Sequence, residues 1–390
     1  QHARLITPER ILRGAHRVED GRSAHRVGED AQPGSDEETY DAQGAYVMPG
    51  LIDLHTHGGA GSDFMDGTAE DVRNAAGFHA RHGVTSLVAT SAAASMAHTE
   101  RFLACIAPLT NTVQKGCRIL GAHLEGPYLS VRNRGAHPEP FLMTPARDGW
   151  DFIRPYVSII RSMTLAPELP GMLEMIRFLA HHDILVSGGH DDGADDAIYP
   201  AIDAGMRHTT HILCAMSTVC KRNGLRHTGL SEIAMIDDRL TTEIIADNMH
   251  IIPDLARLVY RCKGASGMCI VSDTLRPAGM PKDDTRYTVG PRDAEGSQEV
   301  LVDDLVAVLP DRSRFAGSIQ TLDRMIGNLV RDCGIPLVDA VRMATTTPAR
   351  IIGVSDRLGS LTPGKWADLC VMDESLRVVD VFSEGKRLAN

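Results

Sequence analysis

The chain has 390 residues, with 40 Lys and Arg against 51 Asp and Glu, and a formal net charge of −11 at pH 7. This acidic balance argues against nucleic acid or an anionic membrane surface as the partner, and 4% aromatic residues argue against a stacking platform for single strands. A hydrophobic content of 43% is typical of a folded globular protein, and the sequence lacks the roughly 18-residue apolar run of a membrane span.

The two ends of the chain differ from its middle. Residues 1–46 are polar and rich in turn-forming residues, and residues 358–390 hold two alternating segments, 368–372 and 377–382, that are typical of β-strands. We therefore expect residues 1–46 and 358–390 to form one small β-sandwich domain, and residues 47–357 to form a second domain.

In that middle part, short β-branched apolar runs alternate with longer helix-like stretches, which indicates a parallel α/β sheet. Eight strand–helix units over about 300 residues predict a (β/α)8 TIM barrel. A doubly wound sheet, the alternative, would start with a Gly-rich turn and use fewer strands. The expected strands are residues 47–54, 85–89, 118–123, 162–165, 184–188, 208–213, 242–246 and 268–271. The expected helices are residues 69–82, 99–109, 169–182, 195–204, 253–263, 318–333 and 336–346.

One long connection interrupts this alternation. Residues 272–314 follow the eighth strand and are rich in Gly, Pro and Asp. Connections of this length are uncommon unless they serve a function. We expect a hairpin or a lid.

Polar side chains follow the ends of nearly all these strands. In a barrel the carboxyl ends of the strands meet at one rim, so these side chains should surround a single cavity. The residues concerned are Asp53, His55, His57, His123, Glu125, Glu168, His190, His211, Asp247, His250 and Asp273.

Five of these residues have the chemistry of metal ligands. His55-Thr56-His57 follows a strand, and alternation puts both imidazoles on the same side. A ligand set of imidazoles and one carboxylate (Glu125, His190, His211) is typical of an open, catalytic metal site. Asp273, at the end of the eighth strand, can take a proton from water beside such a metal and pass it to a leaving group.

The eight cysteines show no C-x-x-C spacing. In a chain of this length they indicate reduced thiols in a cytoplasmic protein. Metal ligands are therefore expected among the 17 His and the carboxylates.

Motifs spread from about residue 45 to 388 carry a family resemblance. PGLIDLHTH at 49–57 and GSLTPGKWADL at 359–369 resemble the amidohydrolase superfamily. The segments between them look like N-acetylglucosamine-6-phosphate deacetylases. These segments are HLEGP at 123–127, RGAH at 134–137, His211 with AM at 215–216, AD at 246–247 with His250, and AGS at 316–318.

The resemblance implies a role for each matching residue. Glu125, His190 and His211 match the ligands of the family's main metal, zinc or iron. His55 and His57 match a pair that binds a second ion in some members, so one or two divalent ions are expected. Asp273 matches the acid/base, and His137 a catalytic contact near the acetamide. Matching substrate contacts are Ala136, Cys214, Ala215, Arg222, Asp247, His250, Ala316 and Gly317. The family also implies a homodimer with a phosphate contact across its interface.

Two departures from the family pattern concern the substrate. Cys214 stands where the family has Asn, which removes an amide donor from the sugar or phosphate pocket. The loop at 221–227 keeps Arg222 but lacks the family's Arg-Glu-Pro-Gly, and its charges suit either a phosphate or a solvated basic loop.

Three functions are compatible with this pattern. The first is hydrolysis of the acetamide of N-acetylglucosamine 6-phosphate to amino sugar phosphate and acetate. The second keeps the superfamily but changes the substrate, to N-acetylgalactosamine 6-phosphate, a non-phosphorylated acylamino sugar, or another amide or cyclic ureide. The third is a catalytically silent barrel, which predicts that no transition metal binds.

Overall fold

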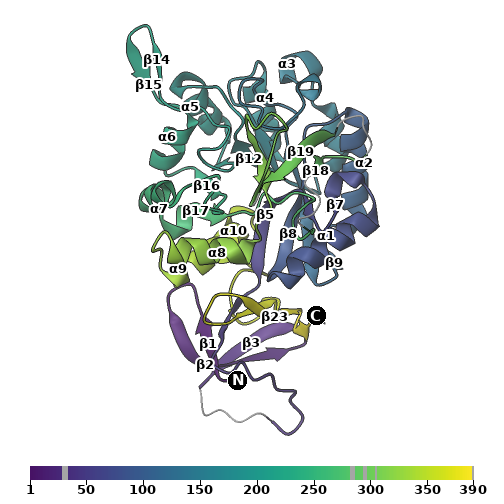
Figure 1. The fold of residues 1–390 in the computed structure, drawn as a ribbon, viewed down its shortest axis with the longest axis vertical. Coiled ribbons are helices and arrows are strands. Elements are labelled where there is room, and N and C mark those ends of the chain that lie inside the picture. Colours follow the sequence, from purple (N-terminus) through teal and green to yellow (C-terminus); the bar gives the residue numbers. More distant parts are fainter. Residues whose placement is uncertain (29–33, 282–285, 293–296, 304, 389–390) are drawn as a thin grey trace.

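The computed structural model describes residues 1–28, 34–281, 286–292, 297–303 and 305–388, and the chain forms a barrel set on a separate β-sheet. Both termini lie in that sheet, at the end of the barrel where its strands begin (Figure 1).

All eight expected barrel strands are present and parallel. The sheet order is β17-β16-β13-β12-β11-β10-β8-β5, so neighbours in sequence are neighbours in space. The two outer strands meet just beyond their ends, where Asp273 N–H donates to His55 O (2.9 Å) and His57 N–H to Thr274 O (2.9 Å). The strands are β5 (Leu51–Thr56), β8 (Val84–Ser91), β10 (Cys117–Glu125), β11 (Ile160–Leu165), β12 (Leu185–Gly188), β13 (His208–Thr209), β16 (Thr241–Ile244) and β17 (Met268–Ile270).

Helices cover the outside of the barrel, as the amphipathic patterns predict. In α8 (Leu322–Arg331), the residues Leu322, Met325, Ile326 and Leu329 are buried, and their spacing forms one apolar stripe. The other helices are α1 (Ala69–Arg81), α2 (Met96–Ile106), α3 (Pro145–Asp148), α4 (Met172–His181), α5 (Asp195–Ala204), α6 (Leu230–Ile236), α7 (Pro253–Gly267), α9 (Leu337–Ala344) and α10 (Thr346–Ile351).

The first expected strand, residues 47–54, is two strands. β4 (Tyr46–Pro49) pairs with β1 and β22 in the terminal sheet, and β5 (Leu51–Thr56) begins the barrel. Gly50 separates them, and a Cβ there would lie 2.0 Å from Thr85 Oγ1. The apolar run is continuous in sequence, but its two halves pack against different sheets.

The terminal sheet joins both ends of the chain, as expected of the small β-domain. Its seven strands have the order β24-β23-β22-β4-β1-β2-β3. The sheet has a small hydrophobic core of its own. Residues near its two edge strands are linked through Ala367, whose N–H donates to Gly21 O (2.9 Å) and whose carbonyl oxygen accepts from Gly385 N–H (2.9 Å). The strands besides β4 are β1 (Ala3–Ile6), β2 (Ile11–Glu19), β3 (Arg22–Val27), β22 (Leu369–Met372), β23 (Val378–Ser383) and β24 (Lys386–Arg387).

The expected lid is an antiparallel sheet. Its strands are β18 (Arg286–Val289), β19 (Gln298–Asp303), β20 (Val306–Val308) and β21 (Phe315–Ser318). The buried Arg276 anchors it, with Nη1 donating to Asp66 Oδ2 (2.6 Å) and Nη2 to Gly290 O (2.8 Å). The helix expected at 318–333 starts only at Leu322, because Ser318 belongs to β21.

A second hairpin stands away from the barrel. Strands β14 (Cys220–Arg222) and β15 (Leu225–His227) project beyond α5 and α6 (Figure 1).

All eight cysteines are free thiols, and four of them are buried. Within the described residues, no helix has the length and apolarity needed to cross a bilayer.

Candidate metal centre and active site

The ends of five barrel strands place four of the predicted ligands and the predicted acid/base around one cavity of ≈340 Å³. Glu125 is the last residue of β10, and His190 and His211 follow β12 and β13. His57 follows β5, and Asp273 follows β17. All five residues line this cavity, and all are buried. The shared direction of the strands therefore brings together residues that are far apart in sequence.

His55 and His57 point their Nε2 atoms at the same two carboxylates. His55 Nε2 lies 3.4 Å from Glu125 Oε1 and 3.5 Å from Asp273 Oδ1. His57 Nε2 lies 3.2 Å from Glu125 Oε2 and 3.3 Å from Asp273 Oδ1. Alternation along the strand thus puts both imidazoles on one side, close enough with Glu125 to hold one metal ion.

The other end of the site joins Glu125, His190 and His211. Glu125 Oε1 lies 3.2 Å from His190 Nε2 and 3.1 Å from His211 Nε2, and the two imidazole nitrogens are 3.1 Å apart. His190 Nδ1 lies 2.8 Å from Asn133 O, a pure acceptor, so Nδ1 carries the proton and Nε2 keeps its lone pair. A lone pair that faces a carboxylate is unfavourable unless a proton or a metal ion lies between them. We call these five residues (His55, His57, Glu125, His190 and His211) the histidine–glutamate cluster.

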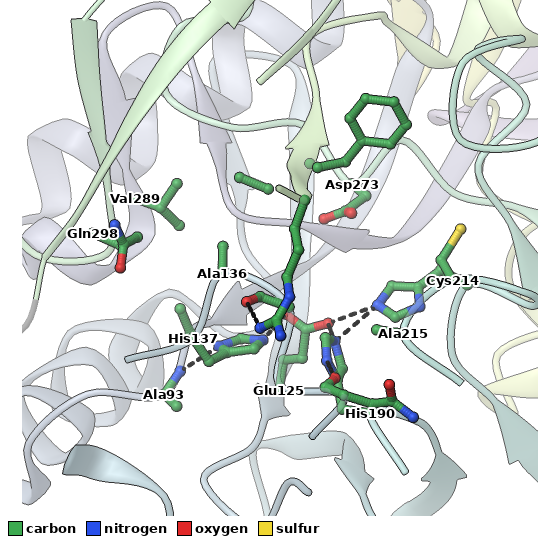
Figure 2. A pocket seen from close by; sticks show the side chains of 18 of the residues that line it. Ala93, Glu125, Ala136, His137, His190, Cys214, Ala215, Asp273, Val289 and Gln298 are labelled. Carbon is green, nitrogen blue, oxygen red and sulfur yellow. Dashed lines mark hydrogen bonds and ion pairs between the residues drawn. The ribbon is translucent and has the colours of Figure 1, made fainter. Parts of the chain in front are cut away.

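His137 meets Glu125 from the other side, but in the opposite tautomer. Ala93 N–H donates to His137 Nδ1 (3.1 Å), so the neutral ring carries its proton on Nε2, 3.3 Å from Glu125 Oε2. Figure 2 shows Glu125 between His137 and His190. Although Glu125, His137 and His190 lie close enough to share an ion, a metal bond at His137 Nε2 would require an imidazolate. His137 is therefore a hydrogen-bond donor to the cavity.

The histidine–glutamate cluster fits a divalent metal ion. His55 Nε2 is buried and has no hydrogen-bond partner among the described residues, and His211 Nδ1 and His57 Nδ1 have none either. Burial lowers the pKa of His57, but Asp273 and Glu125 outweigh it and raise this pKa to about 9. The site thus takes up a positive charge, which either protons or a metal ion can supply, and imidazole with carboxylate suits zinc or iron.

Five residues expected at the rim do not line this cavity, and one of them, His55, is buried within the cluster itself. Asp53 is wholly buried beside the cluster, where its Oδ1 accepts from His55 N–H and Ser272 N–H (3.2 Å each). His123 lies between Thr90 Oγ1 (3.3 Å) and Thr164 Oγ1 (2.7 Å).

Glu168 and Asp247 also miss the cavity lining. Glu168 borders a separate cleft beside α4 and α5 and accepts from Asp192 N–H (2.8 Å). Asp247 holds His250, which does line the cavity, through Nδ1 and Oδ2 (2.7 Å). The position of a residue at the end of a strand therefore predicts that it lies at the rim of the barrel, but not that its side chain points into the cavity.

The cavity wall contains most of the expected substrate contacts. Gly317 has a φ of +152°, and a Cβ there would lie 2.9 Å from Leu275 Cγ and 3.0 Å from Asp273 O. Burial raises the pKa of the Cys214 thiol, so this wall position is neutral. The expected contacts that line the wall are Ala136, Cys214, Ala215, His250, Ala316 and Gly317.

Arg222 lies outside the cavity of its own chain. It is on the projecting β14–β15 hairpin, where Nη1 pairs with Asp196 Oδ1 (3.1 Å). The cations that do line the cavity are Arg132 and Arg314.

Several residues at the site were not predicted from the sequence. The lid contributes Val289, Gln298, Arg314 and Phe315 to the cavity wall, and only the length of the connection indicated this (Figure 2 labels Val289 and Gln298). His79, inside α1, donates from Nε2 to Gly58 O (3.0 Å) and contacts Thr56 Oγ1 (3.0 Å), so it braces the end of β5. Glu243 on β16 touches His55. No sequence pattern marked these last two.

Comparison with known proteins agrees with this geometry. The sequence matches the amidohydrolase family over residues 46–388. An N-acetylglucosamine-6-phosphate deacetylase of Vibrio furnissii is 34% identical over 343 residues, covering 87% of this chain and 82% of the relative. An N-acetylgalactosamine-6-phosphate deacetylase of Escherichia coli O157:H7 is 33% identical over 344 residues, covering 87% of each.

A solved structure gives the same result for the fold. The crystal structure of N-acetylglucosamine-6-phosphate deacetylase from Pasteurella multocida is similar with a TM-score of 0.91 and 27% identity, and the match covers 100% of this chain and 98% of that one. The chain therefore belongs to the amidohydrolase family, as a hydrolase that acts on a linear amide bond.

Proposed function

We propose that the protein hydrolyses the acetamide of N-acetylglucosamine 6-phosphate to glucosamine 6-phosphate and acetate. One observation carries the proposal: a metal-binding cluster, a buried carboxylate and a fixed N–H donor line one cavity. The relatives named for this reaction supply the substrate class.

Glu125, His190 and His211 would hold the main ion, zinc or iron, and His55 with His57 a second one. A bound divalent ion supplies Lewis acidity and lowers the pKa of water. Asp273 accepts a proton from the water whose oxygen attacks the acetamide carbon. Asp273 then gives this proton to the nitrogen as the C–N bond breaks, which releases acetate and the free amine.

The surroundings of Asp273 support a proton acceptor. Burial raises the pKa of its carboxyl, but His55 and His57 beside it outweigh burial and hold this pKa below the ordinary value. Asp273 is therefore ionised at neutral pH, which is the state that the first step needs.

His137 would stabilise the negative charge that develops on the acetamide oxygen. Its Nε2–H is directed into the cavity because Ala93 N–H occupies Nδ1. A donor held in place before the reaction needs no reorganisation when the charge forms. The acetamide would lie against Ala136, Ala316 and Gly317.

Arg222 and His250 would bind the phosphate, together with Cys214 and Ala215 on the wall; Asp247 positions His250. Because Arg222 lies on a projecting hairpin, we propose a homodimer in which Arg222 reaches the cavity of the partner copy. An Arg222→Gln variant that raises KM for the phosphorylated substrate, in a protein that sediments as a dimer, supports this arrangement.

We also propose that the protein is cytoplasmic and has two domains, a small β-sandwich of residues 1–46 with 358–390 and a barrel of residues 47–357. The separate core of the terminal sheet supports this division, and the free thiols support the cytoplasmic location. The strand β4 of the terminal sheet begins at Tyr46 and ends at Pro49, inside the second range, so the junction falls close to Gly50.

The relative at 33% identity favours a second candidate, N-acetylgalactosamine 6-phosphate. The two sugars differ in the orientation of one hydroxyl, and Cys214 alters the wall that a sugar hydroxyl or the phosphate would contact. We rank this substrate second because the similar structure named above is a glucosamine-type deacetylase.

A substrate panel tests the proposal. Acetate release is measured with N-acetylglucosamine 6-phosphate, N-acetylgalactosamine 6-phosphate and plain N-acetylglucosamine, alongside elemental analysis of the purified protein. We expect the highest kcat/KM for the first substrate. Equal rates with and without the phosphate would contradict the phosphate contact, and a preference for the galactosamine epimer would select the second candidate.

A further inference from the structure

Glu243 is a buried carboxylate below the histidine–glutamate cluster. It lies on β16 and is 3% exposed. Its Oε2 lies 3.0 Å from His55 Nδ1 and accepts the His211 backbone N–H (3.2 Å), and its Oε1 lies 3.4 Å from His208 Nε2. A single side chain thus contacts residues from both ends of the cluster.

The contact with His55 decides which nitrogen can bind a metal. A carboxylate offers only acceptors, so His55 Nδ1 carries a proton, and in the neutral ring that a metal ion would bind Nε2 keeps its lone pair. That Nε2 is the buried atom without a hydrogen-bond partner in the described structure, and it faces Glu125 Oε1 and Asp273 Oδ1. With the opposite tautomer, Nε2 would carry a proton and could not bind an ion.

The contact with His211 fixes its backbone. His211 has a φ of +26°, outside the regions that ordinary residues prefer, so its conformation needs support. Glu243 supports it twice: Oε2 accepts the His211 N–H, and the Glu243 carbonyl oxygen accepts the Ile212 N–H (2.9 Å). Residues that hold metal ligands from behind set both the ring orientation and the tautomer.

We propose that Glu243 is a positioning residue that presets His55 and His211 as metal ligands and so couples the two ends of the metal site. This inference deepens the proposed function and rests on it for the identity of the ligands. The position of Oε2 is what matters in this proposal, more than the charge of Glu243.

Two conservative variants separate position from charge. Glu243→Asp keeps the charge but shortens the side chain, so its oxygens cannot reach His55 Nδ1. Glu243→Gln loses the charge but can keep an oxygen at the Oε2 position and direct its amide towards His208. His208→Gln is the matched control, because it changes the residue at Oε1 and leaves the Oε2 contacts.

The measurement is zinc binding to the full chain after chelation, by competition titration without substrate, with the affinity and the number of ions per chain as readouts. We expect Glu243→Asp to weaken zinc binding about 10- to 100-fold. Glu243→Gln should bind closer to wild type, and His208→Gln like wild type. Unfolding temperatures of the metal-free variants, measured alongside, check that each one folds.

Wild-type zinc affinity in Glu243→Asp would overturn the proposal, and so would an equal loss in Glu243→Gln, because that pattern assigns the effect to charge. A drop in unfolding temperature without a change in zinc affinity would also overturn it, by assigning a purely structural role. Because the titration contains no substrate, a different substrate for the enzyme would leave this result unchanged.

Discussion

The terminal sheet and the floor of the barrel cavity both bury charged groups, but they neutralise them differently. In the sheet, Asp380 accepts from Tyr40 Oη (2.5 Å) and from Arg387 Nε (2.6 Å) and Nη2 (2.9 Å). In the cavity, Glu125 and Asp273 face imidazole nitrogens, of which His55 Nε2 has no hydrogen-bond partner among the described residues.

The buried Asp380 of the terminal sheet is paired with donors of the protein and stabilises the fold, whereas the buried groups in the cavity are incompletely paired and can bind a ligand. Leaving a buried polar group unpaired costs about 1–3 kcal/mol, and more when it is charged, so such groups persist where a ligand completes them. Substitutions in the cavity should therefore reduce activity with little loss of stability, and substitutions in the terminal sheet should do the reverse.

The largest expected effect is that of Asp273→Asn. The amide cannot accept the proton of the attacking water, so kcat should fall about 10³-fold, within the range of general acid–base catalysis. Steady-state acetate release and metal content are measured on the same preparation. Near-normal turnover with metal bound would contradict the role of Asp273.

His137→Leu should reduce kcat about 10²-fold, because the variant loses the N–H aimed at the acetamide oxygen. The tautomer fixed by Ala93 predicts that metal content stays unchanged. His137→Gln, which retains an N–H donor, is the control and should lose less. If elemental analysis shows that His137→Leu loses metal, His137 is a ligand and the tautomer argument is wrong.

In the terminal sheet, Asp380→Ala should lower the free energy of unfolding by about 1–3 kcal/mol, because Tyr40 loses the acceptor of its hydroxyl. The kcat should remain that of the wild type. Denaturant unfolding followed by circular dichroism, together with the activity assay, tests this. A parallel loss of activity would show that the sheet and the cavity are coupled.

The last expected effect is a pH dependence of the free energy of unfolding at Asp368, beside β22. Burial raises its pKa to about 6, although Glu384 N–H and Arg118 lower it. Since an unfolded Asp has a pKa near 3.9, the protonated form favours folding. This contribution is complete below that pH and is lost as the pH rises through about 6.

Asp368→Asn should therefore gain stability relative to wild type as the pH rises from 4 to 8, by at most about 3 kcal/mol. The free energy of unfolding of both proteins is measured across this range. If the difference in free energy of unfolding between the two proteins stays constant with pH, the pKa of Asp368 is not raised as the structure indicates.

Much of the fold could be predicted from local pattern. All eight barrel strands, the lid and the terminal sheet follow from alternation and turn composition, because these signals lie within a few residues of each other. The strand at 47–54 was wrong as a single element, since only packing against two different sheets separates Tyr46–Pro49 from Leu51–Thr56.

Most residues of the candidate site could also be predicted from the sequence, but the tautomers of their imidazole rings could not. The spacing of His55 and His57 and the strand-end positions of Glu125, His190 and Asp273 predict a shared rim. Glu168 has the same signal, yet it borders a different cleft. Side-chain direction after a strand ends depends on the local turn, which strand phase does not specify.

By itself, the sequence determined which residues come to the rim of the barrel, because parallel strands of one barrel point their carboxyl ends the same way, but not which of them line the cavity. Only the tertiary structure decided what each imidazole does. The partners that set the tautomers of His137, His190 and His55 are 44, 57 and 188 residues away in the chain. Hydrogen-bond donors and acceptors act over about 3 Å, so the proton of each ring is assigned only once the barrel has closed.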